Sequence, residues 1–311
     1  MLKVLFQAEF HSYAAQKEKN YLYLEKIVFT MIHPQLAGKF YEEDFGSLNK
    51  QIEECFVKTT GDLPAKRRDV ALKGVLVPHS SYFLAGKCYA WAYRELAEST
   101  MPERIVIIAP DNKGLYAAPT TCKDSWSMPF GVVKVDGAFI NDLQEKYPSL
   151  LQEPMQEYAV EVQLPFLQYA YRDRLSDLKI VPLVIPAIVD FQKFAEAISD
   201  IDEKSLILVA ANLTRFGVDH GSVPFKWNIK ENIYMQDQNA LDSMVSLDAL
   251  AFLQQCKKLR MNMIGISAIA TALETMKLLF ATKGRLLNYY TSADITGDYN
   301  NAVGFASAVF Q

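Results

Sequence analysis

The sequence has few of the residues that bind transition metals. It contains only four histidines and four cysteines in 311 residues, with no His-x-His pair and no two cysteines at the two-residue spacing of a zinc knuckle or redox motif. The cysteines are far apart in the chain, which favours free thiols in a reducing cytoplasm over a disulfide framework: Cys55, Cys88, Cys122 and Cys256.

Excess positive charge and long apolar runs are also missing. The formal net charge is -4, so the chain lacks the electrostatic footprint of a protein that binds nucleic acid or anionic lipid. Lysines and glutamates interrupt the first thirty residues, and no later apolar run is long enough to cross a bilayer. We therefore expect a cytoplasmic protein with neither nucleic acid nor membrane as a partner.

Two catalytic signatures are absent as well. No Gly-x-Ser-x-Gly elbow exposes Ser80 or Ser81 as a nucleophile, which argues against a serine hydrolase of the α/β type. No glycine-rich phosphate-binding loop is present either.

The chain does contain short aliphatic runs without strict alternation, which predict strands buried on both faces of a sheet. These are residues 72–77, 104–109, 179–185 and 205–211. Segments with helical spacing lie between them or follow, at residues 45–57, 84–98, 158–171, 191–201 and 241–259, and two more strands are expected at 286–292 and 304–310. The pattern predicts a single-domain α/β sandwich over residues 31–311, with a central, largely buried sheet flanked by helices, and residues 1–30 as an extension that packs on it.

Polar residues follow three of these strands. They lie in the loops 78–82, 110–114 and 212–217, and ligands of open α/β sheets bind at such carboxyl ends. Glu157 and Glu161 are four residues apart, so they share one helical face, and one of them is expected to point into the same cleft.

Each of these residues has an ordinary structural explanation. A histidine after a strand, such as His79, is often only hydrogen-bonded. Asp111 and Asn112 precede Gly114 in a good turn sequence, and Arg215 has the option of pairing with a carboxylate. Asp219 and His220, in a glycine-containing loop, are expected to be solvated.

The order of motifs resembles the Memo family, called AmmeMemoRadiSam system protein B in many prokaryotes. The resemblance is carried by Pro78-His79-Ser80-Ser81-Tyr82 with Gly86, by Met128-Pro129-Phe130-Gly131, by the helix from Glu157 to Pro165, and by residues 209–217. It runs from about His33 to the end of the sequence. It implies the fold of extradiol-type non-haem iron dioxygenases, with a central mixed sheet.

Several members of that family carry a metal held by three histidines and a cysteine. By resemblance, the first histidine is His79, the second falls at Asp111 or Asn112, the third is Arg215, and the cysteine is Ile264. The helix histidine becomes Tyr158, whereas the helix glutamate is retained as Glu161. A guanidinium does not coordinate metals, so we expect the inherited metal site to be absent and no cofactor to be required, with a weakly bound divalent ion left open.

The favoured hypothesis is a Memo-like binding or interaction protein with a polar pocket that suits a small anionic ligand. The predicted pocket residues are His79, Tyr82, Asp111, Asn112, Tyr158, Glu161, Asn212 and Arg215. The alternative is a metal-dependent oxidoreductase that uses His79, Asp111 and Glu161 as ligands. A third hypothesis is metal-free acid–base chemistry, with His79 and Glu161 as the catalytic candidates, so it is left open whether the protein is an enzyme.

The resemblance also implies association with radical-SAM and AmmeMemoRadiSam system protein A-like proteins.

Overall fold

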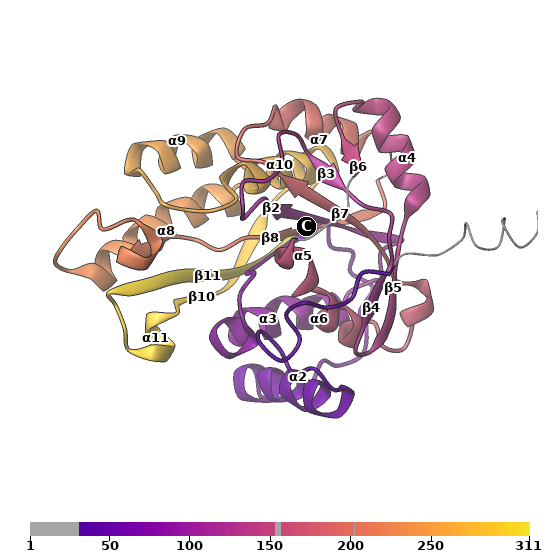
Figure 1. The fold of residues 1–311 in the computed structure, drawn as a ribbon, viewed down its shortest axis with the longest axis horizontal. Coiled ribbons are helices and arrows are strands. Elements are labelled where there is room, and N and C mark those ends of the chain that lie inside the picture. Colours follow the sequence, from indigo (N-terminus) through magenta and orange to yellow (C-terminus); the bar gives the residue numbers. More distant parts are fainter. Residues whose placement is uncertain (1–30, 153–156, 202) are drawn as a thin grey trace, which may run out of the picture.

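A central mixed sheet organises the computed structural model, which describes residues 31–152, 157–201 and 203–311 (Figure 1). Within these residues the sheet has 11 strands, and its main path runs in the order β10-β11-β1-β8-β2-β7-β3-β6. The fold is α/β, with helices on both faces of the sheet, as the sequence predicts.

Four parallel strands form the middle of the sheet. They are β1 (Gly74–Val77), β8 (Ser205–Ala210), β2 (Arg104–Pro110) and β7 (Lys179–Ile185), paired in that order. Alternate residues of each strand face two different apolar cores: Ile105 and Ile107 of β2 face one, and Val106 and Ile108 face the other. Burial on both faces explains why these strands read as continuous aliphatic runs.

Shorter and antiparallel strands complete the sheet. At one side, β11 (Asn301–Phe310) pairs antiparallel with both β1 and β10 (Gly284–Thr291), and β9 (Arg215–Gly217) pairs with β11. At the other side, β7 pairs with β3 (Thr120–Thr121) and with β5 (Gly131–Val135). In turn, β3 pairs with β6 (Leu151–Gln152), and β5 pairs with β4 (Trp126–Met128).

Helices cover the two faces. The first core lies under α2 (Phe45–Thr60), α3 (Tyr82–Ala97) and α6 (Leu164–Ala170). The second lies under α4 (Gly137–Lys146), α7 (Phe191–Ser199), α8 (Ile229–Val245), α9 (Ala249–Leu259) and α10 (Ile266–Leu278). Figure 1 shows α2, α3 and α6 on one side of the sheet, and α7, α9 and α10 on the other.

Two predicted helices are in fact interrupted. Residues 158–171 form α5 (Tyr158–Glu161) and then α6, because Pro165 at the start of α6 has no N–H to continue the preceding helix. Residues 241–259 span the end of α8 and the whole of α9. The chain turns between them at Leu247, whose φ is 55°, and Asp248 caps α9 by accepting from the Ala251 N–H at 2.8 Å.

The predicted strands agree with the structure to within two residues at their ends, apart from an early start of β11 at Asn301. Helix α4, most of α8 and helix α10 were not predicted, and α10 is the most buried of them. Its residues are apolar on nearly all sides, and eight of them are buried, so the segment lacks the polar face that makes a helix visible in a sequence. The predicted N-terminal extension, residues 1–30, lies outside the described residues. In the part of the chain that the structure describes, no helix is both long and apolar enough to span a membrane.

Gly304 of β11 allows a close approach that any side chain would prevent. A Cβ at this position would collide with the carboxylate of fully buried Asp237 and would lie 3.0 Å from the Leu213 Cβ. We expect Gly304→Ala to lower the free energy of unfolding by about 1–3 kcal/mol, measured by urea titration. In the control Gly46→Ala, within α2, the nearest atom is 3.5 Å away, and a neutral or stabilising change of up to about 1 kcal/mol is expected. Equal stability of the two variants would contradict the crowding.

Candidate functional site

The neighbouring strands β1, β8 and β2 end at the same edge of the sheet. The Ala211 N–H donates to the Val77 carbonyl at 2.8 Å, and the His79 N–H donates to Asn212 Oδ1 at 3.0 Å. These two bonds tie the loop after β1 to the loop after β8. They place His79 and Asn212 side by side, as expected for parallel strands.

A cavity of about 390 Å³ opens at this edge. The loops after β1, β8 and β2 supply part of its wall. The remaining lining residues come from the segment before α2, from α3, α5 and the loop before α10, and from the helix α11 (Ala293–Thr296), its flanking residues and β11. The lining residues are Phe40, His79, Ser80, Leu84, Asn112, Tyr158, Asn212, Arg215, His220, Ile264, Ser292, Thr296, Asp298, Asn301, Val303 and Phe305. Five of the eight predicted pocket residues are therefore brought together, and Tyr82, Asp111 and Glu161 are not.

His79 lies deep in this wall, with only 2% of its surface exposed. Burial lowers the pKa of His79 to about 4, because an imidazolium is poorly solvated there. The nearby Asn112 side chain and Ala210 carbonyl oppose this shift, and the positive charge of Arg215 adds to it. The Nδ1 atom has no hydrogen-bond partner of normal geometry, and the ring centroid lies 5.8 Å from that of Tyr158. The imidazole is thus neutral at physiological pH.

Asn112 is oriented by Glu157, the buried N-cap of α5. Glu157 Oε1 accepts from Asn112 Nδ2 at 2.7 Å and from the Ala159 N–H at 3.1 Å, and Oε2 accepts from the Asn112 N–H at 3.2 Å. Burial raises the pKa of Glu157, although these hydrogen bonds lower it in part. Glu157 therefore fixes one wall residue of the cavity without lining the cavity.

Arg215 is the cation of the cavity. Its Nη2 lies 3.2 Å from Nδ1 of His220, and within the described residues its guanidinium forms no ion pair with a carboxylate. Asp237, which is fully buried, fixes the residue that precedes Arg215, because its carboxylate accepts from the Thr214 N–H at 3.0 Å. The same carboxylate accepts from the Tyr289 hydroxyl at 2.7 Å. Burial raises the pKa of Asp237 to about 6. Arg215 is thus a half-buried, unpaired charge on a loop that is firmly attached to the core.

The structure corrects the expected position of Glu161. Its carboxylate accepts three hydrogen bonds, from the Gln35 N–H at 2.9 Å, the Leu36 N–H at 2.8 Å and the Tyr41 hydroxyl at 2.7 Å. It lines a separate, smaller pocket of about 170 Å³. Among the lining residues of this pocket, only Tyr158 also lines the main cavity. Glu161 therefore organises the segment before α2 and does not face His79.

Asp111 is also directed away from the cavity. Its two oxygens accept from the backbone N–H groups of Lys113, at 3.2 Å, and Tyr116, at 2.8 Å. This is the turn chemistry that its sequence context favoured as the ordinary explanation. Its neighbour Asn112, the other residue mapped to the second histidine, is the one that lines the cavity.

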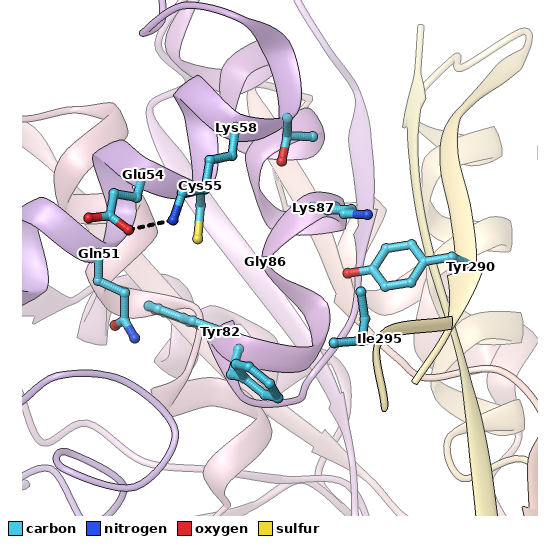
Figure 2. A pocket seen from close by; sticks show the side chains of 11 residues that line it. Gln51, Glu54, Cys55, Lys58, Tyr82, Gly86, Lys87, Tyr290 and Ile295 are labelled. Carbon is cyan, nitrogen blue, oxygen red and sulfur yellow. Dashed lines mark hydrogen bonds and ion pairs between the residues drawn. The ribbon is translucent and has the colours of Figure 1, made fainter. Parts of the chain in front are cut away.

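Tyr82, the first residue of α3, does not line the main cavity but a different pocket. Its hydroxyl donates to the Val162 carbonyl at 2.8 Å, and its ring lines a pocket of about 290 Å³ between α2, α3 and β10 (Figure 2). Figure 2 also shows the Lys58–Glu54 ion pair, 2.7 Å long, and the thiol of Cys55 at this pocket. Burial raises the pKa of Cys55 to about 11, so its thiol is protonated and a poor nucleophile.

Two features of the cavity were not anticipated. His220, expected to be solvated, lines the cavity beside Arg215, and Asp298 adds an exposed carboxylate at the rim. Among the described residues there is no group of three or more histidine, cysteine, aspartate or glutamate side chains arranged to hold a metal ion. The predicted set of His79, Asp111 and Glu161 is accordingly not assembled.

Replacing Glu161 tests its structural assignment. In Glu161→Gln an amide NH₂ must face at least one of the three donors, so we expect a loss of about 1–3 kcal/mol in the free energy of unfolding and faster hydrogen exchange at the Gln35 and Leu36 amides. The same change at exposed Glu145 of α4 is the control, with an effect below about 0.5 kcal/mol. Unaltered exchange at both amides would refute the assignment.

The low pKa of His79 predicts a pH dependence of stability. In the unfolded chain a histidine titrates near 6.5, so between about pH 6.5 and pH 4 the unfolded state binds a proton that the folded state does not. The contribution of His79 to stability therefore falls as the pH falls through this window, by about 3 kcal/mol in all.

The measurement is the free energy of unfolding of the wild type minus that of His79→Asn, because other buried groups titrate in the same range. This difference should decrease towards acid pH. The matched control is His33→Asn, at an exposed histidine outside the cavity. A difference that does not vary with pH would show that His79 is not held neutral.

Comparisons with known proteins confirm the family resemblance. The family model described as Memo-like protein matches residues 33–309. The MEMO1 family protein MK0963 of Methanopyrus kandleri is 33% identical over 286 residues, which cover 89% of this chain and 98% of that protein. A MEMO1 family protein of Methanobrevibacter smithii is 30% identical over 295 residues, covering 89% and 99%. The chain therefore belongs to the Memo-like protein family.

Proposed function

We propose that this Memo-family protein binds a small anionic ligand in the cavity between His79 and Arg215, and that the metal chemistry of the site has been lost. The observation that carries the proposal is the half-buried guanidinium of Arg215, which faces the cavity without a carboxylate partner in the described residues. A cation in such a position is a strong anion-binding group, because charge-assisted hydrogen bonds are about twice as strong as neutral ones.

The other wall residues fit the same ligand class. Hydroxyl and amide side chains line the same cavity as the guanidinium, and apolar side chains provide the remaining contact surface. A cavity of about 390 Å³ lies in the size range of small-molecule sites. The exposed carboxylate of Asp298 also lines the cavity, so it would favour a ligand whose negative charge lies next to Arg215 and away from Asp298.

The donor set does not fit the metal that the family resemblance implies. Of the positions mapped to metal ligands, His79, Asn112, Arg215 and Ile264 all line the cavity. They offer one imidazole, one amide, a guanidinium that cannot coordinate, and a hydrocarbon. Transition-metal sites use about three histidine, cysteine or carboxylate ligands, so we assign no metal-dependent step to this cavity.

The oxidoreductase alternative is weakened by the same contacts. It needs Asp111 and Glu161 beside His79, but the oxygens of both carboxylates accept backbone or tyrosine hydrogen bonds outside the cavity. Acid–base chemistry by His79 would rely on an imidazole with a pKa of about 4, which is a weak base at neutral pH. Association with radical-SAM and protein A-like partners, and residence in the cytoplasm, stay predictions from the sequence.

Anion titration of an Arg215 variant tests the proposal. We expect isothermal titration with sulfate to show binding that Arg215→Gln weakens at least about tenfold, because a charged hydrogen-bond donor is lost. The control is Arg174→Gln, at an exposed arginine paired with Asp177. Equal sulfate affinity in wild type and Arg215→Gln would overturn the proposal. So would tight, stoichiometric binding of iron, copper or zinc that His79→Ala abolishes.

A further inference from the structure

Arg215 and His220 form a pair whose hydrogen bond fixes the protonation state of the histidine. Arg215 Nη2 lies 3.2 Å from His220 Nδ1, and both side chains line the cavity. A guanidinium can only donate, so Nδ1 of His220 must be the acceptor and carries no proton while this bond exists.

The backbone around the pair is held by pairing of β9 with β11 and by the side chain of Asn262. Asn262 Nδ2 donates to the Arg215 carbonyl at 2.9 Å and to the His220 carbonyl at 3.0 Å. The loop between them closes on itself, because Gly217 and Ser222 exchange backbone hydrogen bonds of 2.7 and 3.1 Å. The two side chains are therefore presented together by a short, well-tied loop, and a bound ligand meets both of them.

Burial and the charge of Arg215 oppose the protonation of His220 in the absence of a ligand. Burial lowers the pKa of His220, the charge of Arg215 lowers it further, and Asp219 on the same turn raises it. The other titratable groups of the cavity are His79, which is neutral, Tyr158, whose pKa burial raises to about 12, and Asp298 at the rim. A negative charge placed between Arg215 and His220 would remove the main electrostatic obstacle to protonation.

We propose that His220 is the second cation of the anion site and takes up a proton from solvent when a doubly charged anion binds. Protonation converts Nδ1 from an acceptor into a donor, so the Arg215–His220 bond is replaced by two donors that converge on the anion. This inference rests on the proposed anion site and narrows its ligand to dianions of the sulfate or phosphomonoester class. A singly charged carboxylate is satisfied by Arg215 alone and gains little from the second charge.

Proton linkage gives a quantitative expectation. Sulfate stays a dianion between pH 5.5 and 8.5, so any change of its affinity over this range reports on the protein. We expect sulfate affinity to rise as the pH falls, with a slope of at most about tenfold per pH unit for one coupled proton. Isothermal titration in two buffers with different ionisation enthalpies should show uptake of up to one proton per sulfate, and acetate should show far less.

A matched pair of variants assigns the proton to its residue. In His220→Asn the amide oxygen still accepts from Arg215 but does not titrate, so sulfate binding should persist and lose most of its pH dependence. In His33→Asn, at an exposed histidine outside the cavity, the wild-type pH dependence should remain. Histidine ring NMR of the wild-type protein provides a readout without mutation. Sulfate should raise the pKa of His220, and the proton that is taken up should appear on His220 and not on His79.

The outcomes separate the two proposals. If sulfate binds through Arg215 but without proton uptake, or if His220→Asn keeps the full pH dependence, the role of His220 is overturned and the anion site stands. If sulfate does not bind at any pH, or binds equally well to Arg215→Gln, the anion site fails and the inference fails with it.

Discussion

The parallel pairing of β1, β8 and β2 is the constraint on which the rest of the structure depends. Because the three strands run in the same direction and are neighbours, the loops that leave them must emerge at one edge. Hydrogen bonds between those loops, such as the one from the His79 N–H to Asn212 Oδ1, then bring distant segments of the chain together in the wall of one cavity. The buried aliphatic strands thus form the core, and their parallel pairing places the cavity at one edge of the sheet.

The sequence predicts the α/β class and the convergence at His79, Asn212 and Arg215, since both follow from buried parallel strands. It does not predict which way a side chain points. Glu161 lies on the expected helix, but its neighbours come from the segment before α2, which no local pattern connects to it. His220 was missed for a similar reason, because its place beside Arg215 depends on Asn262, a residue far along the chain.

Buried polar groups in this molecule divide into those that are satisfied and those that are not. Glu161 and Asp237 each accept bonds from groups that lie far from them in sequence, so they act as internal anchors for loops. Arg215 has no compensating charge in the described part of the chain, and Nδ1 of His79 lacks a normal partner. Buried polar atoms without a partner also occur away from the cavity, for example Trp126 Nε1 and Tyr171 Oη, so a missing partner alone does not mark a site. What distinguishes His79 and Arg215 is that both line the same cavity.

Strand β11 has a consequence for the order of events during biosynthesis. Its early residues Asn301, Val303 and Phe305 line the cavity, and its later residues pair with β1, so that Gly74 lies opposite Phe310. The wall around His79 is therefore incomplete until β11 has been synthesised and has paired with β1. Until residues 301–310 have emerged from the exit tunnel, β1 has no partner strand on the side that β11 covers in the folded protein.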